Sequence, residues 1–188
     1  MQKIMFNDRY GLTDAVIEGR KTMTRRIIIP QPDFLSDNFG WAKRNNGDVI
    51  LPKYGVDEVV AVAQSYEAAG FDPEYSIEGM LYAKKHAGWR NKMFVSAKYM
   101  SHRIRITGIK CERLQDISDE DCFREGISES WYESTDTTTY GYADEKKGTA
   151  VEFDTPRKAF AALIDKVSGR GTWASNPWVV VYEFEVVK

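Results

Sequence analysis

The chain has 188 residues, of which 43% are hydrophobic and 13% aromatic, and its net charge is −2. This length allows a hydrophobic core and is most simply a single domain over residues 1–188. The near-neutral charge argues against a uniformly basic nucleic-acid-binding protein, and no stretch approaches the roughly 20 apolar residues that cross a bilayer. The two cysteines, Cys111 and Cys122, and the lack of an apolar leader after Met1 favour a cytoplasmic protein with reduced thiols.

Charge is distributed unevenly along the chain. Residues 84–111 contain eight Lys or Arg and no acid, whereas residues 112–154 contain thirteen acids and four Lys or Arg. This asymmetry predicts either one basic and one acidic surface, or two segments that neutralise each other in the fold.

The first third of the chain predicts two short strands around one helix. An apolar strand is expected at residues 3–6, and a helix at residues 14–18, with Thr13 as its cap. Gly19 then ends the helix, because glycine accepts the left-handed backbone that closes a last turn. A second strand starts near Thr24 and stops at Pro30.

The middle of the chain is less regular. Residues 33–53 contain a strong turn signal at 45–48 and form either a hairpin or an ordered loop. A buried strand is expected at residues 59–63. Residues 67–91 are expected to be mostly loop, and residues 93–98 form a strand candidate.

The C-terminal half predicts longer elements. Residues 103–112 alternate as a strand that bends near Gly108, and Ser118 caps a helix that ends at Gly126. Residues 128–150 predict a long mobile loop, which is a common form of lid. A helix follows Thr155, and a strand occupies residues 178–187. Many short strands and few helices predict an α+β fold, a small mixed β-barrel with short flanking helices.

Residues 19–26, with the sequence Gly-Arg-Lys-Thr-Met-Thr-Arg-Arg, concentrate cations and hydroxyls on a stiff piece of backbone. Such a group suits binding an anion, donating to an oxyanion or activating a hydroxyl. The alternative is a solvated basic face, or cations that only pair with carboxylates. The cations are Arg20, Lys21, Arg25 and Arg26, and the hydroxyls belong to Thr22 and Thr24.

Three features occur in an order that resembles the ASCH family, a branch of the PUA-like β-barrels. They are the Gly-Arg-Lys-Thr-Met-Thr-Arg string after a helix, the strand start at residues 55–59, and the strand–helix unit at residues 113–126. The final Asn-Pro-Trp at residues 176–178 with its strand fits as well. The resemblance, to phage or bacterial ASCH proteins, covers most of the chain and leaves extra loops near residues 30–50, 67–91 and 128–150.

The resemblance implies a partner that is RNA or a modified nucleoside, and no cofactor. One bacterial branch of the family hydrolyses the acetyl amide of N4-acetylcytidine with a lysine, a threonine and a glutamate. Carried over, these roles fall on Lys21, Thr24 and Glu125 as catalytic residues. The chain differs from that branch by its greater length, its acidic loop after Gly126 and its paired arginines. The residues expected to bind substrate or phosphate are Arg20, Arg25 and Arg26.

This chemistry makes geometric demands. A threonine hydroxyl needs a base within about 3 Å to act as a nucleophile. Lys21 can be that base if burial lowers its pKa, and Glu125 can orient Lys21 or transfer protons to the leaving amine. In a regular strand, however, Lys21 and Thr24 point to opposite faces, so a turn or bulge must separate them.

Two further groups of residues have alternative readings. The only histidines, His86 and His102, have no cysteine partners nearby, so no metal site is expected. Aromatic residues interleaved with cations suit single-stranded nucleic acid, although they are also typical of a core. A second aromatic group lies in the 128–150 segment and would cover a bound base or pack the loop down. The first group is Trp89, Phe94 and Tyr99 with Lys84, Lys85, Arg90, Lys92 and Lys98; the second is Trp131, Tyr132, Tyr140 and Tyr142.

A non-catalytic RNA- or nucleotide-binding module is therefore the alternative to an amidohydrolase. In it, Lys21, Arg25 and Arg26 would contact phosphate in the same basic cleft. A third possibility is a phage accessory protein that binds a host protein, and the sequence contains no motif that tests it.

Overall fold

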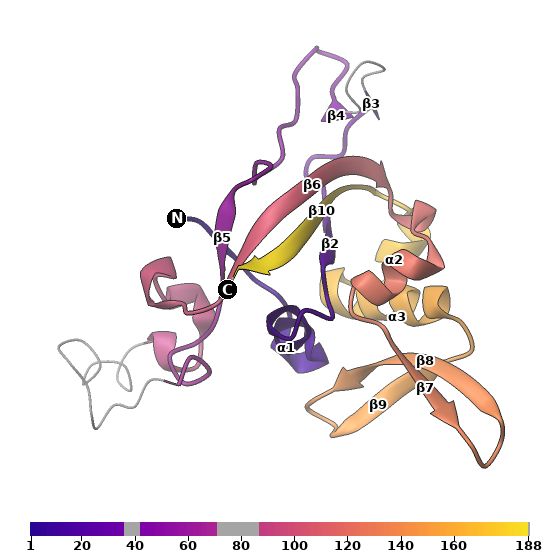
Figure 1. Ribbon diagram of the computed structural model, residues 1–188. Coiled ribbons are helices and arrows are strands. Elements are labelled where there is room, and N and C mark those ends of the chain that lie inside the picture. The colour runs from indigo at the N-terminus through magenta and orange to yellow at the C-terminus, as the bar shows by residue number, and fades with distance from the viewer. Residues whose placement is uncertain (36–41, 71–86, 188) are drawn as a thin grey trace.

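A computed structural model of the protein describes residues 1–35, 42–70 and 87–187. Its main feature is a five-stranded sheet with the strand order β1-β5-β6-β10-β2 (Figure 1). The strands are β1 (Lys3–Ile4), β2 (Met23–Ile27), β5 (Val59–Val62), β6 (Arg103–Arg113) and β10 (Trp178–Val187).

The two long strands, β6 and β10, form the centre of this sheet. They are antiparallel from Trp178 opposite Arg113 to Val187 opposite Arg103. The register shifts beside Gly108, where the sequence predicted a bend, and Thr107 has no direct partner in β10. This extra residue restores Ile109 to the core side, three positions after the buried Ile106.

The sheet is open, so the predicted closed barrel is wrong for the described residues, whereas the α+β class is confirmed. Its edges are β1 and β2, and among the strands that the structure describes no backbone ladder joins them. The physical reason is that β1 supplies only two residues before the chain leaves the sheet for a 3-10 turn, η1 (Asp8–Tyr10), and helix α1 (Leu12–Ile17). A side chain spans the gap instead, because the Arg26 guanidinium donates to the carbonyl of Met5.

Four helices accompany the sheet in the described residues: α1, α2 (Asp119–Arg124), α3 (Pro156–Ser168) and α4 (Thr172–Ser175). The predicted caps Ser118 and Thr155 accept backbone N–H groups at 3.1 and 3.2 Å. Thr13 is not a cap, because α1 begins at Leu12 and the Thr13 hydroxyl donates to Asp8. None of the described helices is long and apolar enough to cross a membrane.

The segment after Gly126 is a second sheet and not the mobile loop that was predicted. It contains β7 (Ser128–Tyr132), β8 (Thr137–Asp144) and β9 (Thr149–Phe153), which are paired as an antiparallel meander. Thr and Tyr are good strand formers, and cross-strand hydrogen bonds satisfy this polar backbone. Tyr142 packs edge-on against Tyr10, and Asp144 binds Arg9, so the sheet is held on the core.

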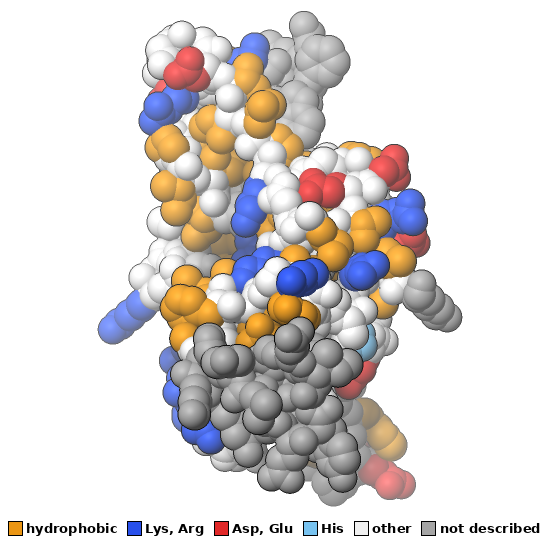
Figure 2. Space-filling model, turned by 90° about the vertical axis from the view of Figure 1, so that its left-hand side faces the viewer, with side chains coloured by type: hydrophobic (Ala, Val, Ile, Leu, Met, Phe, Trp, Pro, Cys, Tyr) orange, Lys and Arg blue, Asp and Glu red, His pale blue; other side chains and the backbone are white. Residues whose placement is uncertain are grey.

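A narrow arm projects above the main sheet in Figure 1. It contains β3 (Phe34–Leu35) and β4 (Ala42–Lys43), which pair as a hairpin, one of the two alternatives for residues 33–53. Hydrophobic side chains are spread over this upper part of the surface (Figure 2), and Ile29 and Leu51 are 85% and 75% exposed.

The predicted strand at residues 93–98 is wrong. The chain there forms short 3-10 helices: η3 (Ala87–Trp89), η4 (Lys92–Phe94) and η5 (Ala97–Tyr99). The Asn91 side chain accepts the N–H of Met93 at 3.0 Å, which favours a turn over extended backbone. Residues 71–86 of the expected 67–91 loop lie outside the described part of the chain.

Candidate functional site

Residues 19–26 leave α1 by a tight turn before β2 begins. Gly19 has the left-handed φ of 77° that the sequence predicted. The N–H of Lys21 then donates to the carbonyl of Ala15 at 2.8 Å, and β2 starts only at Met23. Lys21 therefore precedes the strand, which frees it from the alternation that would have separated it from Thr24.

Glu125 is placed by the end of α2. It is the C-terminal cap of that helix, and Gly126 follows with a φ of 102°. A Cβ atom on Gly126 would lie 3.2 Å from Leu12 and 3.6 Å from the stem of Lys21. A glycine at this position therefore serves both the backbone turn and the passage of the lysine side chain.

Lys21 and Glu125 form a buried pair. The Lys21 ammonium lies 2.5 Å from Oε2 of Glu125 and also donates to the Glu125 carbonyl oxygen at 2.7 Å. The two residues are 2% and 5% exposed. Burial lowers the pKa of Lys21, and the negative charge of Glu125 opposes this shift only in part. Burial therefore favours the neutral amine of Lys21 relative to a lysine in water.

Arg25, which the sequence predicted to bind phosphate, forms ion pairs with three carboxylates of the protein. Its guanidinium lies 2.7 Å from Glu112, 2.7 Å from Asp121 and 3.1 Å from Glu125. Although burial opposes the charge, these carboxylates raise the pKa of Arg25. Arg25 therefore holds β6, α2 and β2 together and fixes the second oxygen of Glu125.

The predicted catalytic residues line one cavity of about 250 Å³. Thr24 is 5% exposed, and its hydroxyl has no hydrogen-bond partner among the described residues. The opposite wall is formed by apolar side chains of α3. The cavity is lined by Lys21, Thr24, Arg25, Arg26 and Glu125 on the polar side and by Phe160, Leu163, Ile164 and Val167 on the apolar side.

The two remaining arginines differ in their positions. Arg20 does not line this cavity; it is exposed and pairs with Glu18 at 2.5 Å. Arg26 does line it, with its guanidinium 5.5 Å from the centre of the Phe6 ring. Lys21 lies 5.9 Å from the same ring, so Phe6 forms an aromatic wall that the sequence reasoning missed. An aromatic residue next to a short strand carries no distinctive sequence signal.

Glu112 and Asp121 were also missed as partners of the cationic segment. Asp121 precedes Glu125 by one helical turn, so the shared face of α2 was visible in the sequence. Glu112 lies on β6, and its approach to Arg25 depends on β10 standing between β6 and β2. Only the strand order reveals that contact.

Several of the aromatic and basic residues that the sequence suggested for nucleic-acid binding have structural roles. Lys92 donates to the Phe6 carbonyl and to Asp8, so it anchors the N-terminal segment. Phe94 is exposed, and Tyr142 is buried in the core instead of covering a ligand. Burial raises the pKa of the Cys122 thiol to about 12.

Within the described ranges, no group of three or more His, Cys, Asp or Glu residues is arranged to hold a metal ion. His86, Lys84 and Lys85 lie outside those ranges. His102 lies next to β6 within them.

Comparison with protein-family models, with curated proteins and with solved structures finds no match for this chain. The resemblance to the ASCH family therefore remains a prediction, and functional inference depends on the cavity itself.

Proposed function

We propose that the protein hydrolyses the acyl amide of a modified nucleoside such as N4-acetylcytidine. The observation that carries this proposal is the buried Lys21–Glu125 pair beside the unpartnered hydroxyl of Thr24 in one cavity. The sequence resemblance to the ASCH amidohydrolase branch suggests the class of substrate. The geometry suggests which atoms act.

The hydrogen bonds of Lys21 are compatible with a role as general base. A neutral lysine amine has two N–H groups and one lone pair. Glu125 offers two acceptors to this nitrogen, its carboxylate at 2.5 Å and its carbonyl at 2.7 Å. When both N–H groups point to Glu125, the lone pair is left to accept the proton of Thr24.

The first half of the reaction forms an acyl-enzyme. Oγ of Thr24 attacks the carbonyl carbon of the amide while its proton passes to Nζ of Lys21. The oxyanion that develops is stabilised by the new charge on Lys21 and by nearby Arg26. The C–N bond then breaks, the Lys21 proton goes to the leaving amine nitrogen, and the acyl group stays on Thr24 as an ester.

The second half regenerates the enzyme. Lys21, again neutral, takes a proton from a water molecule whose oxygen attacks the ester carbon. The carboxylic acid leaves, and the oxygen of Thr24 recovers a proton from Lys21. Glu125 keeps the amine oriented throughout and is itself held by Arg25 at 3.1 Å.

The size of the cavity fits a small planar ligand. A volume of about 250 Å³ is slightly below the ~300 Å³ lower bound of usual ligand pockets. It suits a single base against the apolar face of α3, with sugar and phosphate outside. Phe6, Phe160 and Leu163 would contact the ring.

Chromatography of N4-acetylcytidine incubated with the protein tests the proposal. Cytidine and acetate are expected from the wild type, and at least ~100-fold less from Lys21→Met. Lys147→Met is the matched control, because Lys147 is exposed in the β8–β9 turn and does not line the cavity. No cytidine from the wild type, or equal amounts from wild type and Lys21→Met, overturns the assignment.

The non-catalytic binding module is the second candidate, and the three cations on the cavity wall favour it. It predicts affinity for cytidine or RNA with no turnover. Arg25 contributes little to such a site because three carboxylates surround its guanidinium. Binding by calorimetry without product formation would support this candidate over the enzyme.

A further inference from the structure

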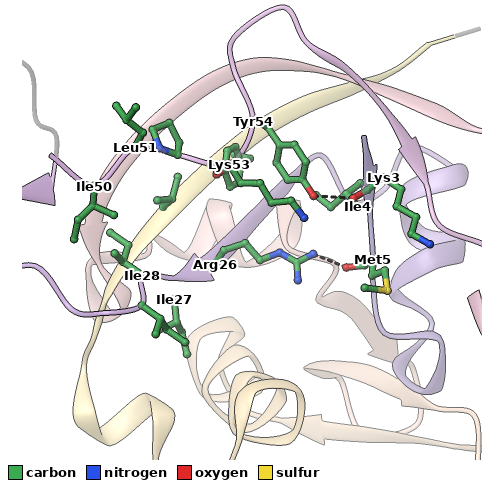
Figure 3. Close-up of a pocket in the computed structure, with 14 residues that line it drawn as sticks. Lys3, Ile4, Met5, Arg26, Ile27, Ile28, Ile50, Leu51, Lys53 and Tyr54 are labelled. Carbon is green, nitrogen blue, oxygen red and sulfur yellow. Dashed lines mark hydrogen bonds between the residues drawn. The ribbon is translucent and has the colours of Figure 1, made fainter. Parts of the chain in front are cut away.

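A second and larger cavity adjoins the first at Arg26. It has a volume of about 350 Å³ and lies between the open edges of the main sheet. The β1 edge and the β2 edge form two walls, and the segment that leads into β5 forms the third (Figure 3). Met5, Arg26 and Ile27 line both cavities, so the two cavities adjoin at these residues.

The charge of this second cavity is entirely positive. Its described lining includes Lys3, Arg26 and Lys53 and no Asp or Glu. The Lys3 ammonium is already saturated, because it donates to the carbonyls of Lys92, Met93 and Val95 at 3.1, 2.6 and 2.8 Å. In Figure 3, Lys3 points away from the cavity while Arg26 and Lys53 extend into it.

Arg26 and Lys53 lack counter-ions within the described part of the chain. Arg26 donates to the uncharged carbonyl of Met5, and Lys53 has its ammonium 5.2 Å from the centre of the Tyr54 ring. Burial lowers the pKa of Arg26 although Glu125 opposes the shift, whereas the neighbouring Arg25 is neutralised by three carboxylates. A half-buried guanidinium without a carboxylate is a favourable partner for an anionic ligand.

The wall that carries Lys53 is fixed in place. The N–H of Lys53 donates to the hydroxyl of Tyr182 at 2.8 Å, and the hydroxyl of Tyr54 donates to the carbonyl of Lys3 at 2.9 Å. The two tyrosine rings pack edge to face at 5.2 Å. This segment therefore presents its lysine from a preorganised backbone, which lowers the entropic cost of binding an anion.

We propose that this cavity is a phosphate subsite, in which Arg26 and Lys53 bind the phosphate of a nucleotide whose acylated base occupies the neighbouring cavity. The assignment of the base rests on the proposed function, whereas the phosphate contact rests on the charges described above. The substrate class is then a nucleotide or an RNA end, and not a free nucleoside. Arg26 would contact both parts of the ligand, because it lines both cavities.

Calorimetry with cytidine, cytidine 5′-monophosphate and cytidine 3′-monophosphate tests the subsite. At low salt, one of the monophosphates is expected to bind the wild type about tenfold more tightly than cytidine, as is typical of charge-assisted contacts to phosphate. Lys53→Gln and Arg26→Gln are expected to reduce this advantage to below about threefold. Lys147→Gln, which removes the same charge from an exposed turn, is expected to keep it.

Two further binding experiments distinguish which phosphate-containing ligand the subsite accepts. Inorganic phosphate should compete with the favoured monophosphate, and a cytidine-containing dinucleotide reports whether a phosphodiester is accepted as well. An advantage that is lost in Lys53→Gln but not in Lys147→Gln supports the subsite even if no hydrolysis is found. Equal binding of cytidine and both monophosphates, or an advantage that survives both pocket variants, overturns the subsite even if N4-acetylcytidine is hydrolysed.

Discussion

Lys21 and Glu125 are 104 positions apart in the sequence, and their charged groups lie 2.5 Å apart in the folded chain. The turn after α1 brings one side chain to this point, and the end of α2 brings the other. Both side chains are almost fully buried, so this ion pair lies inside the protein and not on its surface.

Replacement of Thr24 is expected to affect the rate of hydrolysis and not the stability of the fold. Thr24→Val keeps the branched shape and removes a hydroxyl that has no partner in the described structure. We expect hydrolysis of N4-acetylcytidine to fall by about 10³-fold or more, with little change in the unfolding temperature. Thr24→Ser is expected to retain measurable turnover. Product formation and a thermal melt on both variants provide the check, and an active Thr24→Val protein would remove the nucleophile from the mechanism.

Glu125→Gln is expected to shift the pH profile of the reaction. The charge of Glu125 raises the pKa of Lys21 against the larger effect of burial. Without that charge, the pKa of Lys21 falls further, and the rising limb of kcat/KM against pH moves to lower pH. The rate itself is expected to fall, since the carboxylate no longer orients the amine. A lower rate with an unmoved limb would indicate that Lys21 is not the titrating base.

The lowered pKa of Lys21 also affects stability. Between that pKa and the ordinary value of 10.5, the unfolded chain binds more protons at this residue than the folded chain does. The contribution of Lys21 to the free energy of unfolding therefore rises with pH across this window, and is fully present only above the unfolded value. Lys21→Met removes the rise, whereas Lys147→Met keeps it. Urea titrations from pH 7 to pH 11 compare the three proteins, and parallel curves for wild type and Lys21→Met contradict the shift.

Replacement of Arg25 is expected to lower the stability of the protein. Arg25→Met removes the buried cation that three carboxylates share, and breaking a buried ion pair in this way costs about 3–5 kcal/mol. Arg25→Lys is also expected to destabilise, because one ammonium cannot match the forked geometry of the guanidinium. Denaturant midpoints measure this cost. Arg20→Met serves as the control and should stay within ~0.5 kcal/mol of wild type, since its pair with Glu18 is exposed. Equal losses at both positions would show that the carboxylates do not depend on Arg25.

Local structure could be predicted from the sequence wherever neighbouring residues decide it. Ser118, Thr155 and Gly19 mark helix ends through hydrogen bonds or backbone angles that span a few residues. The alternation in β6 and β10 reflects burial of one face, and the irregularity at Gly108 was visible as well. The strand predicted at residues 93–98 is an exception, since the signal that overturns it, the turn-forming Asn91 side chain, is local as well.

The two wrong predictions about the sheets both concern pairing between segments that are distant in the sequence. The polar composition of residues 128–150 resembles a loop, and only cross-strand hydrogen bonds turn it into the β7–β8–β9 sheet. The barrel prediction failed because strand count does not specify whether the edges meet, and the edges β1 and β2 do not.

For the candidate site, the sequence by itself placed Lys21 and Thr24 on one segment and Glu125 at a helix end, because those positions follow from local turns. Only the tertiary structure decided that the three side chains share a cavity, that Arg25 is neutralised and that Arg20 lies outside. It also decided that Arg26 forms no ion pair among the described residues. The physical reason is that burial and charge compensation depend on which strands and helices become neighbours, and the order of residues along the chain does not encode this directly.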